Sequence, residues 1–461
     1  MSFSDLTFLF YFLPLFFAVY YIVPFRFKNT VLVLGSAAFY FLGAGVRDCV
    51  LLGASVVLHY ALARGMEGRT VRARRALLVF GLCVDLFGLV YFKYAAFLLE
   101  NLGKLTGTAF SLVELALPLG ISFYLFQSVG YLIDVSRGRP AEKSFIDFSA
   151  FVLAFPQLTM GPILRYDEWR GALKSRTIAR EDVFLGFERF LIGLCFKVLL
   201  ADQLAPLWAS LERIGYGYLS TPLAWLGAVS YSLQLYFDFS GYSLMAMGLG
   251  QMLGLPVPRN FDLPYLSRSV SEFYRRWHIT LGTWFRDYVY IPLGGSRRGK
   301  ARTALSLTVV WVFTGLWHGA SWNFVLWGVV LLCCILLEKF CIGSFLKEHR
   351  VLSHLYLLFV IPQTWVIFRI TRLSDVGAYF SRLFPFFGTH SAVSAQDALK
   401  LLSSYWWLLL LAVLFCLPQP RRFYEKHRGS LALDLPLFLL FWVCVYFIAT
   451  SSGNAFLYSR F

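Results

Sequence analysis

Residues 304–337 read ALSLTVVWVFTGLWHGASWNFVLWGVVLLCCILL, and no charged side chain occurs between Arg302 and Glu338. Two apolar runs, 304–317 and 322–337, flank His318 within this stretch. A helix needs roughly 20 mostly apolar residues to cross a bilayer. Two such runs in succession therefore predict membrane-embedded helices that carry one ionisable side chain between them.

The whole chain shares this apolar character. Of its 461 residues 58% are hydrophobic and only 15% are charged, whereas soluble chains are usually near half apolar and a quarter charged. This composition excludes an ordinary soluble enzyme. Further apolar runs occupy residues 8–23, 31–42, 50–63, 76–92, 117–133, 145–164, 183–200, 223–239, 244–255, 355–368, 405–417 and 435–448. We predict an all-α polytopic membrane protein with about eleven transmembrane helices plus re-entrant or partial helices, forming a single integral-membrane domain over residues 1–461.

The distribution of basic residues predicts the orientation. The net charge is +16, and the apolar composition favours cytoplasmic loops and anionic lipid over nucleic acid as its explanation. Lys and Arg gather in residues 64–75, 137–143, 165–180, 268–302 and 421–428, whereas 201–222 carries few. Loops rich in Lys and Arg remain in the cytoplasm. Because three apolar runs precede residue 64, we expect the N terminus outside.

The segment 145–164 does not resemble a lipid-facing helix. It carries Asp147, Gln157 and two prolines, which would leave polar backbone groups unsatisfied in lipid. We therefore expect this segment to be re-entrant or surrounded by protein.

The segment 267–293 carries an apolar stripe at helical spacing, from Phe273 through Trp277 to Ile291. Ser269 and Glu272 form a possible capping box at its start. Arg275, Arg276, His278, Arg286 and Asp287 lie off the stripe. This pattern predicts an amphipathic helix, and a basic helix lying among cytoplasmic headgroups is the simplest alternative to a functional one.

His318 is the first candidate for chemistry. An ionisable group within such apolar sequence is costly and is a functional candidate by default, although a structural histidine is the alternative. Gly315 and Gly319 flank it and permit close approach of another backbone or a substrate. The sequence has no serine-hydrolase elbow, no HExxH metal motif and no Walker loop. Acid–base catalysis of group transfer, with no metal, is the simplest enzymatic interpretation.

Residues 260–295 read NFDLPYLSRSVSEFYRRWHITLGTWFRDYVYIPLGG, and GLWHG follows at 315–319. These motifs resemble the membrane-bound O-acyltransferase family, in its branch of bacterial membrane subunits that O-acetylate alginate and other polysaccharides. Further similarity lies in PLGISFY at 118–124, YLID at 131–134, FPQ at 155–157, GPI at 161–163 and FLYSRF at 456–461.

The resemblance implies helices around a central tunnel in a bacterial cytoplasmic (inner) membrane. It implies His318 as the catalytic residue and His278 as the second signature histidine. Acetyl-CoA would be the cytoplasmic acyl donor, a substrate and not a bound cofactor. The acetyl group would reach a polysaccharide hydroxyl directly or through an extracytoplasmic acetyltransferase partner.

The binding candidates follow from this mechanism. Arg275 and Arg276 suit a phosphate-bearing donor, although lipid headgroups explain these charges equally well. The tetrahedral oxyanion of acyl transfer needs hydrogen-bond donors, for which His278, Asn323, Trp277 and Trp317 are candidates.

Two other functions remain open. One is D-alanyl transfer to teichoic acid, with a carrier protein as donor. The other is a non-enzymatic transporter in which His318 lines a proton or substrate path.

Overall fold

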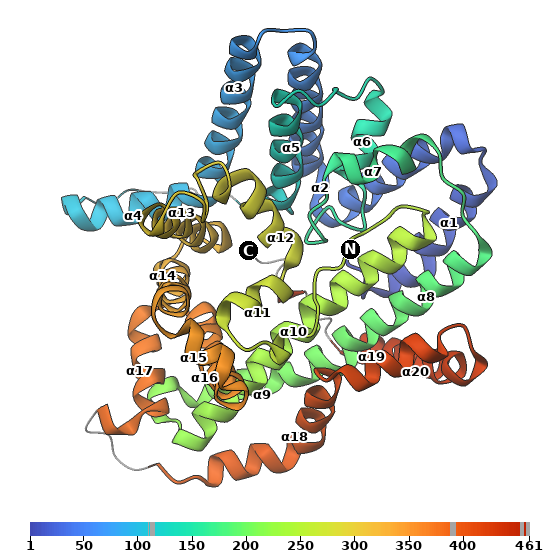
Figure 1. The fold of residues 1–461 in the computed structure, drawn as a ribbon. Helices are drawn as coiled ribbons and strands as arrows, with labels where there is room; N and C mark the ends of the chain where they lie inside the picture. Colours follow the sequence, from blue (N-terminus) through green and yellow to red (C-terminus); the bar gives the residue numbers. More distant parts are fainter. Residues whose placement is uncertain (109, 111–115, 388–392, 452–455, 458–461) are drawn as a thin grey trace. The chain divides into compact units, whose positions relative to one another are not determined.

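The computed structural model describes residues 1–108, 110, 116–387, 393–451 and 456–457. The described part is helical, with one isolated β-bridge between Phe261 and Trp277, which confirms the all-α prediction. The chain packs as two compact units (Figure 1). The first comprises residues 1–190 and 244–258 with the described residues after 447, and the second comprises 191–243 and 259–447. That both lie in a single membrane domain stays a prediction. The last four residues of the 456–461 motif lie outside the described part.

The first unit contains the N-terminal helices. Their bounds are η1 Phe8–Phe12, α1 Leu13–Ile22, α2 Phe25–Met66, α3 Val71–Leu89, η2 Val90–Tyr94, α4 Ala95–Thr106, α5 Ile121–Ser136, α6 Phe145–Leu153, α7 Tyr166–Lys174 and α8 Arg180–Cys195, of which the last continues into the second unit. In Figure 1, α3 and α5 lie side by side, and they are in contact.

Helix α2 joins two predicted runs in one element with a sharp kink. At Gly45 the backbone has φ 80° and ψ −176°, which only glycine adopts without strain. Each arm is about 20 residues, or roughly 30 Å, long and matches the hydrocarbon thickness of a bilayer. One helix therefore has the length for two spans.

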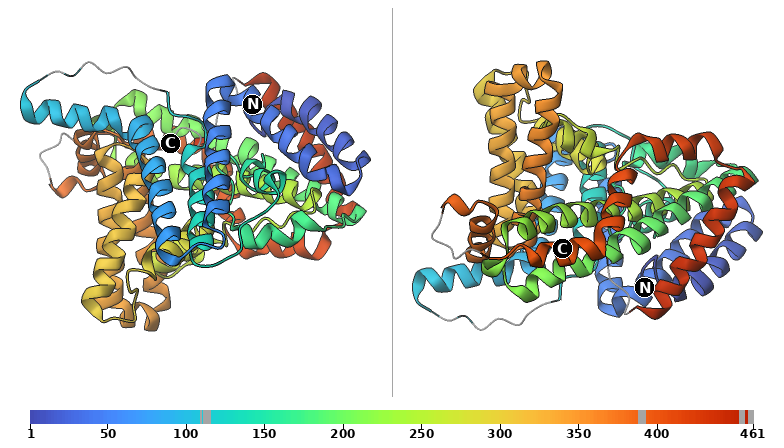
Figure 2. Two further views of the ribbon diagram at one scale, coloured as in Figure 1. Left: turned by 90° about the horizontal axis from the view of Figure 1, so that it is seen from above. Right: turned by 90° about the horizontal axis from the view of Figure 1, so that it is seen from below.

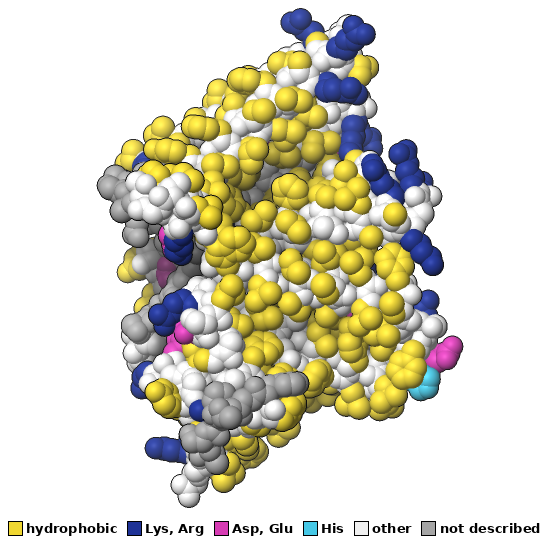
Figure 3. Space-filling view, turned by 90° about the vertical axis from the view of Figure 1, so that its left-hand side faces the viewer, with side chains coloured by type: hydrophobic (Ala, Val, Ile, Leu, Met, Phe, Trp, Pro, Cys, Tyr) yellow, Lys and Arg dark blue, Asp and Glu magenta, His cyan; other side chains and the backbone are white. Residues whose placement is uncertain are grey.

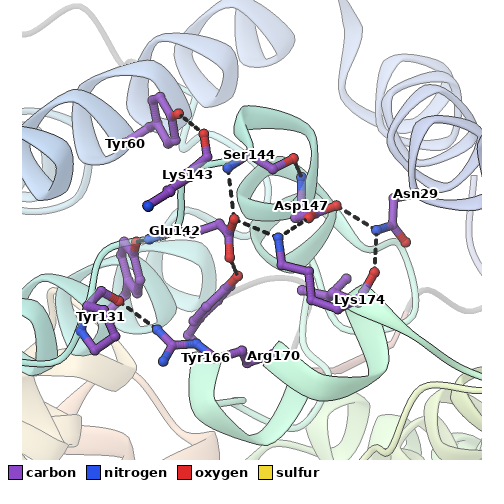
Figure 4. Close-up of polar contacts among 12 residues, drawn as sticks. Asn29, Tyr60, Tyr131, Glu142, Lys143, Ser144, Asp147, Tyr166, Arg170 and Lys174 are labelled. Atoms are coloured by element: carbon purple, nitrogen blue, oxygen red, sulfur yellow. Dashed lines mark hydrogen bonds and ion pairs between the residues drawn. The ribbon is translucent and has the colours of Figure 1, made fainter. Parts of the chain in front are cut away.

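Both ends of α2 return to the same polar network (Figure 4). Near its start, Asn29 Nδ2 donates to Asp147 Oδ1 at 2.6 Å, and near its end Tyr60 Oη donates to Lys143 O at 2.6 Å. A straight helix would separate residues 29 and 60 by roughly 46 Å. Instead their partners, Lys143 and Asp147, are only four positions apart in the chain, so the kink folds α2 back on itself.

A buried carboxylate organises this network. Glu142 accepts hydrogen bonds from Lys174 Nζ at 2.7 Å, from Ser144 N at 2.8 Å and from Tyr166 Oη (Figure 4). Burial raises the pKa of Glu142, but these hydrogen bonds outweigh that effect and hold its pKa below the ordinary value. Hydrogen bonds to Glu142 and its neighbours thus connect the basic loop 137–143 with the end of α7.

The segment 145–164 is helical only as far as Leu153 and is largely buried beyond it. Gln157 Nε2 donates to Phe151 O at 2.8 Å, and Phe155 N donates to Ser36 Oγ at 3.0 Å. Protein therefore satisfies these polar groups, which confirms the prediction that the segment is not an ordinary lipid-facing helix.

The second unit contains the remaining elements. Their bounds are η3 Phe196–Ala201, α9 Asp202–Ile214, η4 Tyr216–Tyr218, α10 Thr221–Met252, η5 Pro264–Leu266, α11 Val270–Arg276, α12 Ile279–Phe285, η6 Arg286–Tyr290, α13 Lys300–His318, α14 Trp322–Leu337, η7 Glu338–Ile342, α15 Gly343–Glu348, α16 Arg350–Arg369, α17 Leu373–Leu383, η8 Pro385–Phe387, α18 Gln396–Phe415, α19 Pro418–His427 and α20 Leu431–Thr450; the end of α10 belongs to the first unit. Helices α13, α14 and α16 lie side by side (Figure 2).

The prediction of one amphipathic helix over 267–293 is wrong. The chain forms α11 and α12 with a break at Trp277 and His278, because His278 adopts a left-handed conformation. The start is as predicted: Ser269 Oγ accepts from Glu272 N at 3.0 Å. The carboxylate of Glu272 accepts from Arg268 N and not from Ser269, so the box is not reciprocal.

Six described helical segments are long and apolar enough to cross a membrane, and α2 is one of them. Their bounds are 25–66, 71–106, 322–348, 350–369, 396–415 and 431–450. Hydrophobic side chains cover most of the face in Figure 3, and Lys and Arg lie mainly at its margins. Such exposed apolar helices are suited to lipid, and the chain is a multi-pass membrane protein. The number of eleven spans stays a prediction.

Candidate active site

His278 lies at the break between α11 and α12. Its φ of 48° and ψ of 53° place it in the left-handed region, which is strained for a residue with a side chain. Backbone bonds on either side hold it there: Asp262 N donates to Arg276 O at 2.9 Å, and Ile279 N donates to Asn260 O at 3.0 Å. The segment 260–262 therefore fixes the direction in which the imidazole projects.

The His278 side chain is buried and contacts polar and aromatic groups. Its Nδ1 lies 3.2 Å from Asn260 Oδ1, and none of the described residues bonds to its Nε2. The ring of Phe239 meets the imidazole edge-on, with centroids 4.8 Å apart. One ring nitrogen is thus held, and the other has no hydrogen-bond partner among the described residues.

His318 ends α13 and is also buried, at 4% exposure. The ring centroids of Trp327 and Phe368 each lie 5.0 Å from its imidazole. Trp365 packs against both of these residues. These aromatic rings exclude water from one side of His318.

The indole of Trp317 connects the two histidines. Its centroid lies 4.7 Å from that of His318 and 6.1 Å from that of His278. The two signature histidines, 40 positions apart in the chain, therefore lie beside the same indole. That they form one site stays a prediction.

The other predicted contact residues lie around this pair. Trp277 is buried and stacks on Phe273. Asn323 is fully buried, and its Nδ2 donates to Ile367 O at 3.2 Å and to Phe368 O at 2.9 Å. Because its amide hydrogens are directed at backbone carbonyls, the group that Asn323 offers to a ligand is its oxygen. The substrate contacts of Trp277, Trp317 and Asn323 stay predictions.

Two of the cationic residues of this region form ion pairs, and one of these two, Arg286, is also exposed. Arg276 bonds Glu272 at 2.8 Å, and Arg286 bonds Asp287 at 2.7 Å. Arg275 is exposed. Further along, the exposed cations are Arg297, Arg298 and Lys300. Exposed cations suit a phosphate-bearing donor better than paired ones do. Donor binding by Arg275 and Arg276 stays a prediction.

The loop before α11 carries its own charge cluster. Asp262 accepts from Arg421 at 2.6 Å and from Arg259 at 3.1 Å. Burial raises the pKa of Asp262, but the neighbouring arginines outweigh that effect and lower the pKa below its usual range. This cluster anchors the segment that holds His278.

Sequence reasoning missed Asn260 and the aromatic wall of Trp327, Trp365 and Phe368. Asn260 belongs to the NFDLP motif, but its 18-residue separation from His278 gives no periodic signal that the two meet. The aromatic residues are indistinguishable from ordinary apolar positions in a membrane helix.

The chain matches known proteins over most of its length. A model of the membrane-bound O-acyltransferase family matches residues 80–372. The probable alginate O-acetylase AlgI of Azotobacter vinelandii is 40% identical over 84% of this chain and 78% of its own. The peptidoglycan O-acetyltransferase of Helicobacter pylori is 30% identical over 100% and 98% of the two chains. The teichoic acid D-alanyltransferase of Streptococcus thermophilus is 33% identical over only 46% of this chain and 54% of its own.

Proposed function

Since the chain belongs to the membrane-bound O-acyltransferase family, we propose that this O-acyltransferase moves an acetyl group from a cytoplasmic thioester to hydroxyls of an exported polysaccharide. The observation that carries the proposal is the burial of His278 and His318 around the common neighbour Trp317. The names of the relatives at 40% and 30% identity support acetyl as the group and a polysaccharide as the acceptor.

The chemistry assigns a role to each histidine. His318 acts as general base and takes the proton of the acceptor hydroxyl while the hydroxyl oxygen attacks the thioester carbonyl. The carbon–sulfur bond of the tetrahedral intermediate then breaks, and His318 returns the proton to the leaving thiolate. The products are the acetyl ester and the free thiol. His278 orients the acceptor through a hydrogen bond.

Acetyl-CoA is the donor in this proposal. The exposed cations Arg275, Arg297, Arg298 and Lys300 provide charge for its phosphates. Lys300 begins α13 and His318 ends it, which separates them by roughly 27 Å along the helix. An extended thioester arm, with its phosphates at the basic end, suits this separation.

The first unit supports the proposed orientation. A Cβ on Gly43 would lie 3.2 Å from Met1 N, so the N terminus lies by the kink of α2. Tyr40 Oη donates to Leu119 O at 2.6 Å, so the segment that leads into α5 lies there too. The network at Glu142 and the loops 64–75 and 137–143 lie toward the other ends of these helices. With the basic end in the cytoplasm of a bacterial inner membrane, the N terminus faces outward. An extracytoplasmic acetyltransferase partner then receives the acetyl group or acts beside this protein.

Reconstitution in lipid nanodiscs tests the proposal. Radiolabelled acetyl-CoA and a radiolabelled D-alanyl carrier protein are supplied separately with an alginate, peptidoglycan or teichoic acid fragment as acceptor. Labelled ester is measured with and without added extracytoplasmic extract. We expect acetyl ester and free CoA in equal amounts. Ester formation from the D-alanyl carrier alone would favour teichoic acid alanylation. Proteoliposomes that transport substrate without cleaving any thioester would favour a transporter.

A further inference from the structure

Asn260 holds His278 from two directions. Its backbone oxygen accepts from Ile279 N at 3.0 Å, directly after His278. Its side-chain Oδ1 lies 3.2 Å from His278 Nδ1 and accepts from Thr280 Oγ1 at 3.0 Å. Asn260 is fully buried. A single residue therefore restrains both the backbone and the ring of His278.

The backbone of Thr280 determines which amide atom faces the imidazole. Thr280 N lies 3.2 Å from Asn260 Oδ1, and a backbone N–H can only donate. The amide nitrogen in that place would set one donor against another, so the oxygen must occupy it. On the other side, Asn260 Nδ2 donates to Ser243 Oγ at 3.3 Å.

The orientation of the amide determines the tautomer of His278. An oxygen that faces Nδ1 requires a hydrogen on Nδ1, and a neutral imidazole then carries a lone pair on Nε2. Nε2 is buried and none of the described residues bonds to it. A buried lone pair is costly to leave without a hydrogen bond. A second hydroxyl of a sugar acceptor, next to the one that His318 deprotonates, would donate to it.

We infer that Asn260 is a positioning residue that holds His278 in the Nδ1-protonated tautomer, so that Nε2 accepts from a hydroxyl of the acceptor beside the one that reacts. This inference rests on the proposed function and names the group through which His278 acts. The strained backbone of His278 supports it, because strain persists where the surrounding structure enforces one orientation.

The group that contacts His278 Nδ1 is the amide of Asn260 and not a charged side chain. The elements that contact His278 do so through Phe239 of α10, Trp317 of α13 and Asn260. The acidic, basic and histidine groups beside these contacts in the chain are Asp238 bonded to Lys197, Asp262 bonded to Arg259 and Arg421, Arg276 bonded to Glu272, exposed Arg275, and His318. Lys300 and Arg302 lie at the opposite end of α13. The partner of Nδ1 is the neutral amide of Asn260.

The experiment compares pH profiles of acetyl transfer in nanodiscs, from pH 5 to 9, for Asn260→Ala, Asn260→Asp and the wild type. Partners that orient metal-bound histidines are worth about 10–100-fold in activity. By the same reasoning we expect a fall in kcat of about that size for Asn260→Ala, with little change in KM. A carboxylate still accepts from Nδ1 but favours imidazolium, so Asn260→Asp should regain activity at high pH. Its acid limb should shift upward by about 1–3 pH units. Asn101→Asp, which adds the same charge in the first unit, is the matched control and should leave the profile unchanged.

A spectroscopic readout keeps the test independent of activity. The 15N shifts of His278, assigned by difference from His278→Gln, should show a protonated Nδ1 and a bare Nε2 in the wild type, and a mixture in Asn260→Ala. A wild-type proton on Nε2 overturns the inference even if no transfer is detected. So does an Asn260→Asp profile that superimposes on the wild type. A wild type that shows the expected tautomer but transfers no acetyl group refutes the proposed function alone.

Discussion

Gly315 of α13 and Gly328 of α14 meet backbone to backbone. A Cβ built on Gly328 would lie 3.3 Å from Gly315 Cα and 2.6 Å from Trp311 O, and both distances are shorter than an ordinary contact. Small residues permit this approach of two helices in membranes. Because His318 follows Gly315 by three residues and Trp327 precedes Gly328, the crossing brings the imidazole to its aromatic wall.

The first prediction concerns this crossing. Gly328→Ala should lower the free energy of unfolding by about 1–3 kcal/mol, because its methyl group must push the two backbones apart. Transfer activity should fall with it, since His318 moves relative to Trp327. Thermal unfolding in detergent and a transfer assay measure both effects. Gly53→Ala is the control, because its Cβ meets no atom within 4 Å and alanine favours a helix. Equal stability of the two variants would contradict the argument.

His318→Ala should abolish acyl transfer while expression and membrane insertion remain near normal. A general base is worth at least roughly a hundredfold in rate. Activity is measured per amount of purified protein, with His349→Ala as the control because His349 is exposed. Retention of more than about a tenth of wild-type activity by His318→Ala would rule out the general-base role.

His278→Ala should impair transfer less than His318→Ala, because in the proposed mechanism His278 orients the acceptor and does not move its proton. We expect a loss of about 10–100-fold, typical of a lost positioning group. Steady-state kinetics of the two variants side by side make the comparison. An indispensable His278 with a dispensable His318 would exchange their roles.

Glu142→Gln should lower the free energy of unfolding by about 1–3 kcal/mol, because the amide must direct a donor at groups that already donate. The lowered pKa of Glu142 means that the unfolded chain binds its proton more readily, so this stability is present above a pH of about 4.3 and is lost as the pH falls through the folded pKa. Thermal midpoints between about pH 6 and 3 should therefore decline less for Glu142→Gln than for the wild type. Glu67→Gln removes a half-exposed partner of Arg64 and should change little.

Thiol labelling tests the orientation. In a cysteine-free background, Arg69→Cys and Arg298→Cys should resist an impermeant reagent until cells are permeabilised, whereas Tyr218→Cys should react at once. The neighbouring Gly215 and Gly299 are unsuitable positions, because both have positive φ and a side chain there would strain the backbone. External labelling at residue 298 would reverse the proposed direction of transfer.

The sequence predicts a helix well where burial of apolar side chains in lipid or protein determines it. The sequence predicts less well where the backbone conformation of one residue decides whether a helix continues. The apolar runs predict α14 and α16, and the prolines within 145–164 indicate that the end of this segment is irregular. The break at His278 was not predicted, because the apolar stripe continues through Trp277 and Leu281 and hydropathy carries no information on φ. The contact between Asn260 and His278 depends on a β-bridge between segments that show no strand pattern.

The kink at Gly45 also bears on how the chain enters the membrane during synthesis. The two arms of α2 are joined by one residue, Gly45. No loop is therefore long enough to remain outside the bilayer after the first arm has inserted and before the second arm has been synthesised. The only charges directly after the kink, Arg47 and Asp48, are paired at 2.7 Å. We therefore expect the arms to insert together as a helical hairpin, with the second arm carrying residue 64 and the basic loop back to the side of synthesis.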